Sequence, residues 1–442
     1  MPVIRPFRGI HYDFARHADL TPLLSPPYDA VDEARRAALE AQSPWNAVHL
    51  EAEGQRPGDG GAENRFSRSA RYLEEWRAQG VLVRDDRPAI YALEQRFEEG
   101  GEQRVRHGFL ASLELQELGF GVLPHEQTLP APGEDRFRLY RAARANTSPI
   151  FCLYADDEGE SEVILQQARS GRPNATGTLG GVENRLWRME QPEVARGLTR
   201  LLAHRRAFIA DGHHRYEMAL AHARACEAEG APASGAHRTI LACFCPMSDT
   251  GLVIRPVHRL VTGLSVEIGR LLLLLDEHFD VEELVEDVRK PAGLAWAQRR
   301  LAEAGRSGHA LLLLAGADRK ARLLRLKEGV DLSHVTALPR NPTLRTLDVA
   351  LLQGLVLRHT LGLREEAAGW GEHLAYVRDE AELVTRAFAG ADALGFLVNP
   401  TPMWQVRAVA EAGERMPART TFFHPKVPAG LVFHSIDPHD PA

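Results

Sequence analysis

The sequence of 442 residues has few cysteines and few lysines, and each shortage limits what the chain can do. Four cysteines suit a reducing compartment. Cys243 and Cys245 form a C-x-C pair, one residue shorter than the usual zinc-knuckle spacing and without a second pair, so we predict no structural zinc there. Only four basic residues are lysines and the rest are arginines, which indicates a composition bias. Arginine abundance therefore says little about function.

Long hydrophobic runs and an excess of positive charge are also missing. The longest leucine run covers residues 271–275 between Arg270 and Asp276, far short of the roughly 18 apolar residues that cross a bilayer. The N-terminal residues have no apolar signal core, so we expect a cytoplasmic protein without a membrane partner. A net charge of −7 argues against a general nucleic-acid binder. No G-x-x-x-x-G-K-[ST] loop is present, which disfavours the usual kinase folds.

Hydrophobic content of 44% and charged content of 26% are typical of a globular protein with a large core. Strand and helix patterns alternate, so the fold class is predicted as α/β, mixed with α+β. We predict a strand at 46–52, a helix at about 65–79 and a β-hairpin within 89–115. Residues 170–185 are predicted to form an exposed loop outside the main elements. A change to leucine-rich texture near 265 suggests domains at 1–265 and 266–442, with Lys426 in the second.

The segment "FIADGHHRYEMALAHARA" (208–225) is the most informative one. An apolar strand at 207–210 leads into Asp211 and Gly212, and a helical stripe begins at Tyr216. His213, His214 and Arg215 would occupy the first helical turn, where free N–H groups and the helix dipole favour anions. Cations there are unfavourable unless an anion binds. The segment therefore predicts a phosphate or carboxylate cradle. Two simpler readings are a helix cap by Asp211 and a metal site on the histidines.

Three further segments hold candidate site residues. In "HEQTLPAPGEDRFRLYRAARANTSPI" we select Glu126 as a general base and His125 as part of the substrate pocket. Arg136, Asn146 and Ser148 are candidates for binding the phosphate or the nucleotide, although a solvated arginine-rich helix would explain much of the pattern. "SPPYD" presents Tyr28 and Asp29 after a stiff Pro-Pro bend, as a site wall or as a structural corner. The remaining candidates are Lys426 between two prolines, and His258 with Arg259 at the end of a strand.

Taken together, these motifs resemble the domain of unknown function 1015 family. The resemblance runs from "RPFRGIHYD" and "SPPYDAV" through "HEQTLPAPGEDR" and "FIADGHHRYEMAL" to "FFHPKVPAGLVF", nearly the full length. That family's activity is not established, so the resemblance implies a fold more than a reaction.

"IADGHHR" also resembles the signature of the ParB/sulfiredoxin superfamily, which includes partitioning CTPases, sulfiredoxin and a free-serine kinase. This resemblance implies a ParB/sulfiredoxin-like phosphate-binding core followed by a C-terminal α/β region. It implies that Gly212 and the amides of residues 213–215 bind phosphate, and that His213 or His214 assists transfer. Asp211 would fix the turn, or hold a metal or a hydroxyl, and Arg215 would bind phosphate or brace the fold.

From these features we expect nucleotide-dependent phosphoryl transfer to a small hydroxyl substrate, with a serine-like amino acid as the best single choice. ATP or ADP would be the nucleotide, and Mg²⁺ would arrive with it. Glu126 or Asp211 would take the hydroxyl proton. Two alternatives remain: a nucleotide-binding switch of the ParB type, and a metal-dependent phosphohydrolase built on the two histidines.

Overall fold

The computed structural model describes residues 1–127, 133–264, 266–364 and 373–441, and it divides into two compact units. Unit 1 comprises Met1–Pro124, Ala131–Val253 and Phe423–Ala442; unit 2 comprises His125–Pro130 and Ile254–Phe422. The chain passes between them at β13 (Val253–Pro256) and returns at β20 (Thr421–His424). The boundary therefore differs from the single one expected near 265, because the last twenty residues rejoin the first unit. Thr128, in the predicted polar loop, lies outside the described residues.

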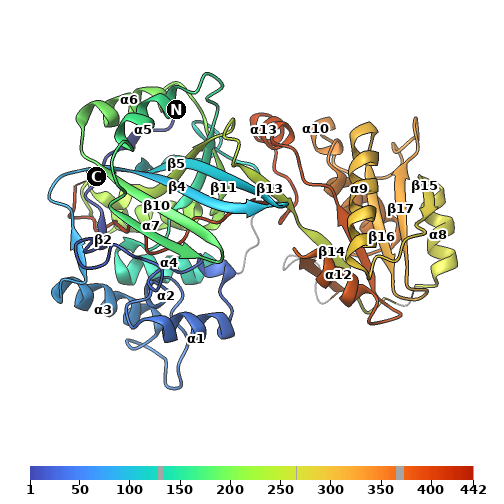
Figure 1. Cartoon of the computed structure of the whole chain (residues 1–442), viewed down its shortest axis with the longest axis horizontal. Helices are drawn as coiled ribbons and strands as arrows, with labels where there is room; N and C mark the ends of the chain where they lie inside the picture. The colour runs from blue at the N-terminus through green and yellow to red at the C-terminus, as the bar shows by residue number, and fades with distance from the viewer. Residues whose placement is uncertain (128–132, 265, 365–372, 442) are drawn as a thin grey trace. The chain divides into compact units, whose positions relative to one another are not determined.

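Unit 1 is built on a mixed sheet of nine strands in the order β6-β11-β8-β12-β5-β4-β10-β9, with β1 beside β5 (Figure 1). The pairs β6/β11 and β8/β12 are parallel, and the other pairs are antiparallel. The strands are β1 (Ile4–Arg5), β4 (Ile90–Glu99), β5 (Glu102–Glu114), β6 (Val122–Pro124), β8 (Ile150–Tyr154), β9 (Ala175–Leu179), β10 (Val182–Met189), β11 (Ala207–Asp211) and β12 (Thr239–Pro246). Two short pairs join β2 (Ile10–Tyr12) to β3 (Leu82–Arg84) and β7 (Ala145–Asn146) to β21 (His434–Ser435).

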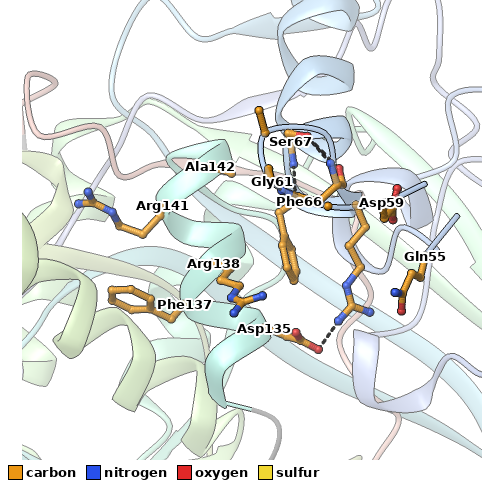
Figure 2. Close-up of a pocket in the computed structure, with 14 residues that line it drawn as sticks. Gln55, Asp59, Gly61, Phe66, Ser67, Asp135, Phe137, Arg138, Arg141 and Ala142 are labelled. Carbon is orange, nitrogen blue, oxygen red and sulfur yellow. Dashed lines mark hydrogen bonds and ion pairs between the residues drawn. The ribbon is translucent and has the colours of Figure 1, made fainter. Parts of the chain in front are cut away.

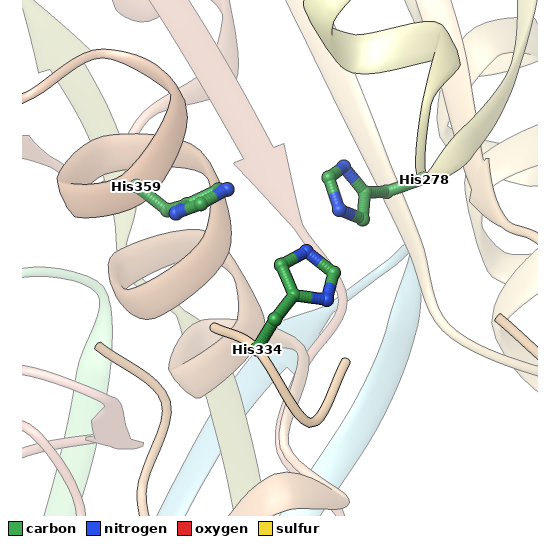
Figure 3. A group of neighbouring side chains, drawn as sticks. All are labelled: His278, His334 and His359. Atoms are coloured by element: carbon green, nitrogen blue, oxygen red, sulfur yellow. The ribbon is translucent and has the colours of Figure 1, made fainter. Parts of the chain in front are cut away.

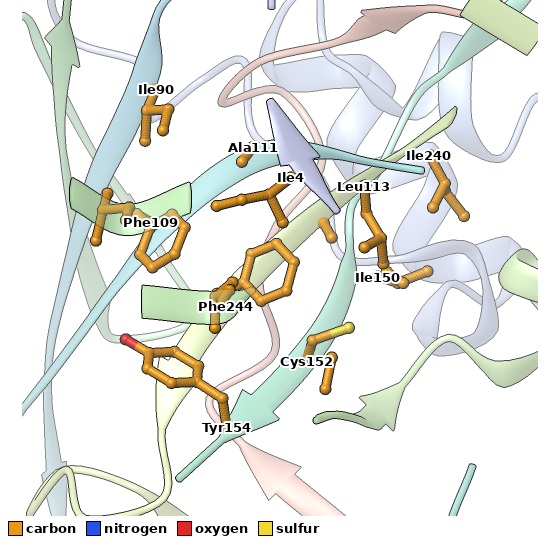
Figure 4. Close-up of a cluster of buried hydrophobic side chains, with 14 of the residues drawn as sticks. Ile4, Ile90, Phe109, Ala111, Leu113, Ile150, Cys152, Tyr154, Ile240 and Phe244 are labelled. Atoms are coloured by element: carbon orange, nitrogen blue, oxygen red, sulfur yellow. The ribbon is translucent and has the colours of Figure 1, made fainter. Parts of the chain in front are cut away.

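Helices form the rest of unit 1, and one hydrophobic core joins several of them to the sheet. Their bounds are η1 (Tyr28–Ala30), α1 (Glu33–Gln42), α2 (Val48–Glu51), α3 (Arg65–Ala78), α4 (Gly133–Ala143), α5 (Glu160–Ala168), α6 (Pro192–Leu202), α7 (His213–Ala228) and η2 (Ala236–Arg238). Alternate residues of β4, β5, β8 and β12 point into this core, as Phe109, Ala111 and Leu113 do in β5 (Figure 4). The period of two follows from the pleat. Tyr216, Ala219 and Ala223 of α7 pack into the same core, as their helical spacing predicts.

Several predicted elements are confirmed and two are wrong. The hairpin is β4 with β5, and the helix at 65–79 is α3, whose first turn has an Asn64 capping box. Residues 46–52 do not form a strand: Val48–Glu51 is the short helix α2, since Asn46 accepts the Val48 N–H and starts a turn. The segment 170–185 is not a simple excursion, because it holds β9 and the start of β10 at the edge of the sheet.

Unit 2 is a three-layer arrangement around an antiparallel sheet in the order β15-β17-β16-β19-β14-β18. The strands are β14 (His258–Val261), β15 (Phe279–Glu283), β16 (Ala310–Ala315), β17 (Lys320–Leu326), β18 (Leu374–Val377) and β19 (Leu394–Val398). Leu311 and Leu313 of β16 face one core, which includes Leu271 of α8 and Leu355 of η3. Leu312 and Leu314 face the other, which includes residues of α9 and α12. Both faces of β16 are thus covered, which explains its uninterrupted leucine run.

The helices of unit 2 are α8 (Ile268–Asp276), α9 (Pro291–Ser307), α10 (Pro342–Arg345), α11 (Asp348–Leu351), the π-helix η3 (Leu352–Thr360), α12 (Glu380–Ala387) and α13 (Met403–Glu411). The fold as a whole is of the mixed α/β class, as the sequence predicts. Among the described helices, none combines the length and the apolar character that crossing a bilayer requires.

Candidate functional site at the start of helix α7

The strand, turn and helix predicted around Asp211 are present in unit 1. Strand β11 ends at Asp211, Gly212 takes a left-handed conformation with φ of +89°, and α7 begins at His213. A Cβ atom on Gly212 would lie 2.9 Å from Arg215 Nε and 2.9 Å from Ile150 Cγ2. Only glycine satisfies both the backbone angle and this close approach. His213 and His214 are partly exposed on the first turn, whereas Arg215 is buried.

Asp211 does not occupy the capping position of α7, because the N-cap residue is Gly212, which has no side chain. Its carboxylate instead lies between two cations. One oxygen contacts Lys426 Nζ, and the other accepts a hydrogen bond of 2.7 Å from the Arg215 guanidinium. Burial alone would raise the pKa of Asp211, but the charges of Lys426 and Arg215 outweigh burial and lower it from 3.8 to about 2. Asp211 is therefore a fixed anion at neutral pH.

Arg215 connects this turn to a second buried group. Its guanidinium donates to the Pro149 carbonyl and, over 3.2 Å, to Ser148 Oγ. Ser148 Oγ in turn donates to Glu51 Oε1 over 2.8 Å. The Arg215 side chain thus joins the first turn of α7 to the residues just before β8 and, through Ser148, to the end of α2.

Glu51 is the centre of the second group and is almost fully buried. Its carboxylate accepts two bonds from Arg136, of 3.0 and 3.1 Å, together with bonds from Thr147 Oγ1, Ser148 Oγ and the Tyr28 N–H. The Tyr28 ring stacks on the Arg136 guanidinium at 4.1 Å. Burial raises the pKa of Glu51, but Arg136 outweighs it and the pKa is lowered overall. Glu51 is therefore held as a carboxylate.

A fourth cation holds the segment that carries Lys426. Arg106 is buried, and its guanidinium donates to Gln95 Oε1, to the Pro425 carbonyl at 2.6 Å and to the His424 carbonyl at 3.3 Å. These acceptors are neutral oxygens, and the Phe151 ring lies 4.5 Å from the guanidinium carbon. Burial lowers the pKa of Arg106. Arg106 thereby fixes the backbone of 424–425 and adds positive charge beside Lys426.

We call these residues the charge network; it contains four cations and two carboxylates, namely Arg106, Arg136, Arg215 and Lys426 with Asp211 and Glu51. Asp29 is a further carboxylate whose charge acts on Arg215, but it is exposed. The network therefore keeps an excess of positive charge at a helix N-terminus, where the dipole adds to it. Such a place is electrostatically suited to an anion.

Two pockets of unit 1 adjoin the Arg136 end of this network. The smaller, of about 150 Å³, is lined by Tyr28, Glu51 and Arg136 among others. The larger, of about 780 Å³, lies between α3 and α4, where Arg65 pairs with Asp135, and Phe137 and Arg138 contribute from α4 (Figure 2). Arg65, Phe66 and Asp135 line both. Of the pockets described, none has residues 211–215 in its lining, so a cleft at the α7 turn stays a prediction.

The structure brings together most of the predicted site residues of unit 1. Tyr28, Arg136, Ser148 and the turn from Asp211 to Arg215 are linked through Glu51, and Lys426 joins them from the C-terminal segment. Lys426 thus belongs to unit 1, although the sequence placed it in a C-terminal domain. Asn146 is fully buried, and its Oδ1 accepts the Leu241 N–H at 2.9 Å. That bond fixes the backbone of β12, while Asn146 Nδ2 has no protein partner.

Four other predicted residues lie in unit 2. The Glu126 carboxylate accepts the N–H groups of residues 419–421 at 2.7, 3.1 and 3.2 Å, and His125 Nε2 lies 2.8 Å from Thr421 Oγ1. Arg259 is fully buried and donates to the Arg419 carbonyl at 3.1 Å, and burial lowers its pKa to about 10. His258 Nδ1 accepts the Val398 N–H at 3.2 Å. Glu126, His258 and Arg259 bind backbone groups of unit 2, and His125 contacts a side chain there. A catalytic role for Glu126 stays a prediction.

Sequence reasoning missed Glu51, Thr147 and Arg106. The pattern of 46–52 predicts a strand, in which Glu51 is one polar residue of an ordinary alternation. Thr147 stands beside two selected residues and could have been included with them. Arg106 is one arginine among many within a β-strand, and nothing in its local pattern indicates that it binds the carbonyls of 424 and 425. Contacts that join positions more than 300 residues apart leave no local pattern.

Comparison with known proteins gives a family and a set of distant folds. The family model described as "Protein of unknown function (DUF1015)" matches residues 4–350. Among curated proteins, none matches the sequence. A conserved hypothetical protein from Pyrococcus furiosus has 13% identity and a TM-score of 0.33, with 70% of this chain and 90% of that chain covered. A free serine kinase in complex with AMP has 12% identity and a TM-score of 0.33, covering 70% and 89%. SbnI with C-terminal truncation from Staphylococcus aureus also has 12% identity and a TM-score of 0.33, with 69% of this chain and 81% of that chain covered.

Proposed function

The chain belongs to the DUF1015 family, and from that premise we propose that it transfers a phosphoryl group from a nucleotide, ATP or ADP, to a small hydroxyl compound. The charge network at the start of α7 supports this proposal most directly. Lys426 and Arg215 approach one carboxylate beside Gly212, at the positive end of a sixteen-residue helix. The resemblance of "IADGHHR" to a phosphate-holding signature points to the same turn.

Phosphoryl transfer depends mainly on positioning and on neutralising charge, and the residues of this turn supply both. The N–H groups that follow Gly212 would bind the transferred phosphate, since the first N–H groups of a helix have no partner within the helix. Lys426 would neutralise charge on the phosphate oxygens, because it is a mobile point charge on a flexible stem. Arg215 is buried with three fixed partners, so its role would be to hold Asp211 and the turn rather than to move.

In the proposed step the substrate hydroxyl oxygen forms a bond to the terminal phosphorus, and the bond from phosphorus to the bridging oxygen breaks. The shortened nucleotide leaves with the electrons of that bond, and the hydroxyl proton passes to a base. Asp211 suits this duty poorly, since its pKa of about 2 lies far from neutral. We assign the proton to His213 or His214, because both stand on the first turn of α7 beside the proposed phosphate site.

Mg²⁺ would enter with the nucleotide rather than reside on the chain. Within the charge network both carboxylates already accept bonds from cations and hydroxyl groups, so neither offers oxygens that Mg²⁺ prefers. When bound to the nucleotide, Mg²⁺ supplies charge neutralisation for the phosphates. The two pockets beside α4 would accept the rest of the nucleotide or the acceptor, with Phe66 and Phe137 as aromatic surfaces.

The test is a thermal-shift screen of ATP, ADP and AMP with and without Mg²⁺, followed by ³¹P NMR with free serine as the first acceptor. A ligand that binds only the folded state raises the melting temperature. At a concentration of a hundred times its Kd it adds about 2.7 kcal/mol to the free energy of unfolding. Lys426→Met should abolish the nucleotide shift. Lys320→Met is the matched control, since Lys320 also pairs with one carboxylate, Glu283 at 2.7 Å, but in unit 2. If neither the unaltered chain nor the Lys320→Met control responds to any nucleotide, the proposal is wrong.

A further inference from the structure

Three histidines from separate segments of unit 2 lie together, away from the charge network in the chain. His278 follows helix α8, His334 belongs to the segment before α10, and His359 lies in the last turn of the π-helix η3. One nitrogen from each ring lies within 4.8 Å of the others. The ring centroids are 5.7, 5.8 and 5.9 Å apart. Figure 3 shows the three rings turned toward a common space.

We infer that His278, His334 and His359 bind one divalent transition-metal ion, with zinc as the metal and with water or a small anion completing its coordination. Imidazole nitrogen is a preferred ligand for zinc, and three histidines with an open fourth position make a known type of zinc set. This inference is independent of the proposed phosphoryl transfer, because it rests on other residues in the other unit.

Burial supports a ligand role for His278. The residue is 4% exposed, and its Nδ1 has no hydrogen-bond partner in the protein. A buried polar atom without a partner costs about 1–3 kcal/mol, so such atoms are uncommon unless something binds them. The burial of the His278 ring beside two other imidazoles agrees with a ligand role for this residue.

The spacing is close to what a metal requires. Two nitrogens that each lie about 2.0–2.1 Å from a tetrahedral zinc are about 3.4 Å apart. The ring nitrogens of the three histidines lie up to 4.8 Å apart, which is more than this distance. However, His334 and His359 are exposed, and their side chains can rotate inward. Only His278 is held by packing. Ligands from outside can reach the ion on the exposed side.

The second group of metal-type side chains among the described residues, Glu40, His49 and Glu53, is a weaker candidate. Glu53 already accepts bonds from Arg56 at 2.7 Å and from Arg68 at 3.1 Å. Its negative charge is thus compensated by two guanidinium groups, and a cation would have to compete with them.

Metal binding would tie three parts of unit 2 together. The histidines belong to the turn between α8 and β15, to the irregular segment 327–341 and to η3. A π-helix is rare and is often found at functional sites. The widened turn of η3 places His359 on the layer that also contains α8. A bound ion would therefore stabilise the folded state of unit 2.

The experiment uses the full chain without a histidine tag, stripped with a chelator and dialysed. Zinc binding is measured by calorimetry, and Co²⁺ is added separately because its visible absorption reports tetrahedral nitrogen coordination. We expect one equivalent per chain and a raised melting temperature. His334→Ala and His359→Ala should each weaken binding by more than about tenfold, the least that losing even an outer-shell partner costs. Both positions are exposed, so these variants should fold.

His204→Ala is the matched control, because His204 is exposed and lies in unit 1. It should bind zinc as the unaltered chain does. Binding of several equivalents with the same strength in all four proteins would mean scattered surface histidines and would overturn the inference. Absence of any saturable binding would overturn it too.

Discussion

Lys426 Nζ contacts the carboxylate of Asp211, although the two residues are 215 positions apart in the sequence. Asp211 ends the strand before α7, and Lys426 belongs to the C-terminal segment that returns to unit 1. The same carboxylate binds Arg215 from the other side. This arrangement keeps two cations next to the N-terminus of a helix, where they would otherwise repel each other and the dipole. We therefore expect both the stability of the turn and its affinity for an anion to depend on the contact between Asp211 and Lys426.

The first prediction concerns Asp211→Asn and its dependence on pH. The folded state lowers the pKa of Asp211 from 3.8 to about 2, so its stabilisation is complete above the ordinary pKa and is lost as pH falls through the folded value. The variant should be less stable by about 2 kcal/mol at pH 7, and the difference should shrink between pH 4 and pH 2. Urea unfolding at pH 7, 4 and 3 measures it. Asp157→Asn, at an exposed position, is the control. An unchanged difference across that range would contradict the assignment.

The second prediction separates chemistry from stability at His213 and His214. Both residues are partly exposed on the first turn of α7, where positive charge opposes the dipole by roughly 0.3–1 kcal/mol. Replacing either by alanine should leave the melting temperature unchanged or slightly higher, while nucleotide-dependent transfer falls by at least about a hundredfold for the residue that takes the proton. His204→Ala serves as the control here too. If the variants unfold readily but keep their activity, the histidines are structural.

The sequence was sufficient for the features that depend on neighbouring residues. The strand, the glycine turn and the helix at 207–228 follow from a short apolar run, a D-G pair and apolar spacing of three and four. The β4/β5 hairpin follows from two runs of β-formers around a glycine pair. In each case the physical cause lies within about twenty residues, so pattern and structure agree.

Features that depend on distant contacts could not be read in this way. The "NAVHLEA" stretch resembles a strand by alternation, but an Asn46 turn makes it helical and points Glu51 into the core. The rarity of lysine and the flanking prolines indicate Lys426 as a candidate, but neither feature identifies Asp211 as its partner. Glu126 beside His125 suggests a general base, whereas its carboxylate accepts three backbone N–H groups of 419–421. The role of a carboxylate depends on partners that are distant in the sequence, and a local sequence pattern does not identify those partners.

The third prediction concerns Gly212→Ala, with Gly230→Ala as a matched control. Both glycines have positive φ, +89° and +87°, but a Cβ on Gly212 would meet Arg215 and Ile150 at 2.9 Å, whereas Gly230 has nothing within 4 Å. The control should lose about 1 kcal/mol, the cost of the left-handed conformation alone. Gly212→Ala should lose clearly more, and it should also abolish the nucleotide shift because Arg215 must move. Equal losses in the two variants would show that close approach at Gly212 does not matter.

The last prediction concerns Glu51→Gln, which keeps the size of the side chain but removes its charge. Glu51 accepts from Arg136 on both oxygens and from Thr147, Ser148 and the Tyr28 N–H. A glutamine amide would turn an NH₂ group toward some of these donors and leave the buried Arg136 without its counter-charge. Breaking a buried pair in this way costs about 3–5 kcal/mol.

The matched control is Glu114→Gln, since Glu114 also pairs with one arginine, Arg5 at 3.0 Å, but on the surface. An exposed pair of this kind is worth roughly 0–1 kcal/mol. Urea unfolding at neutral pH gives both values. Because Glu51 reaches Arg215 through Ser148, the variant should also weaken the response to nucleotide in whatever fraction folds. A loss as small as that of Glu114→Gln would mean that Arg136 finds another partner, and the network would then not depend on Glu51.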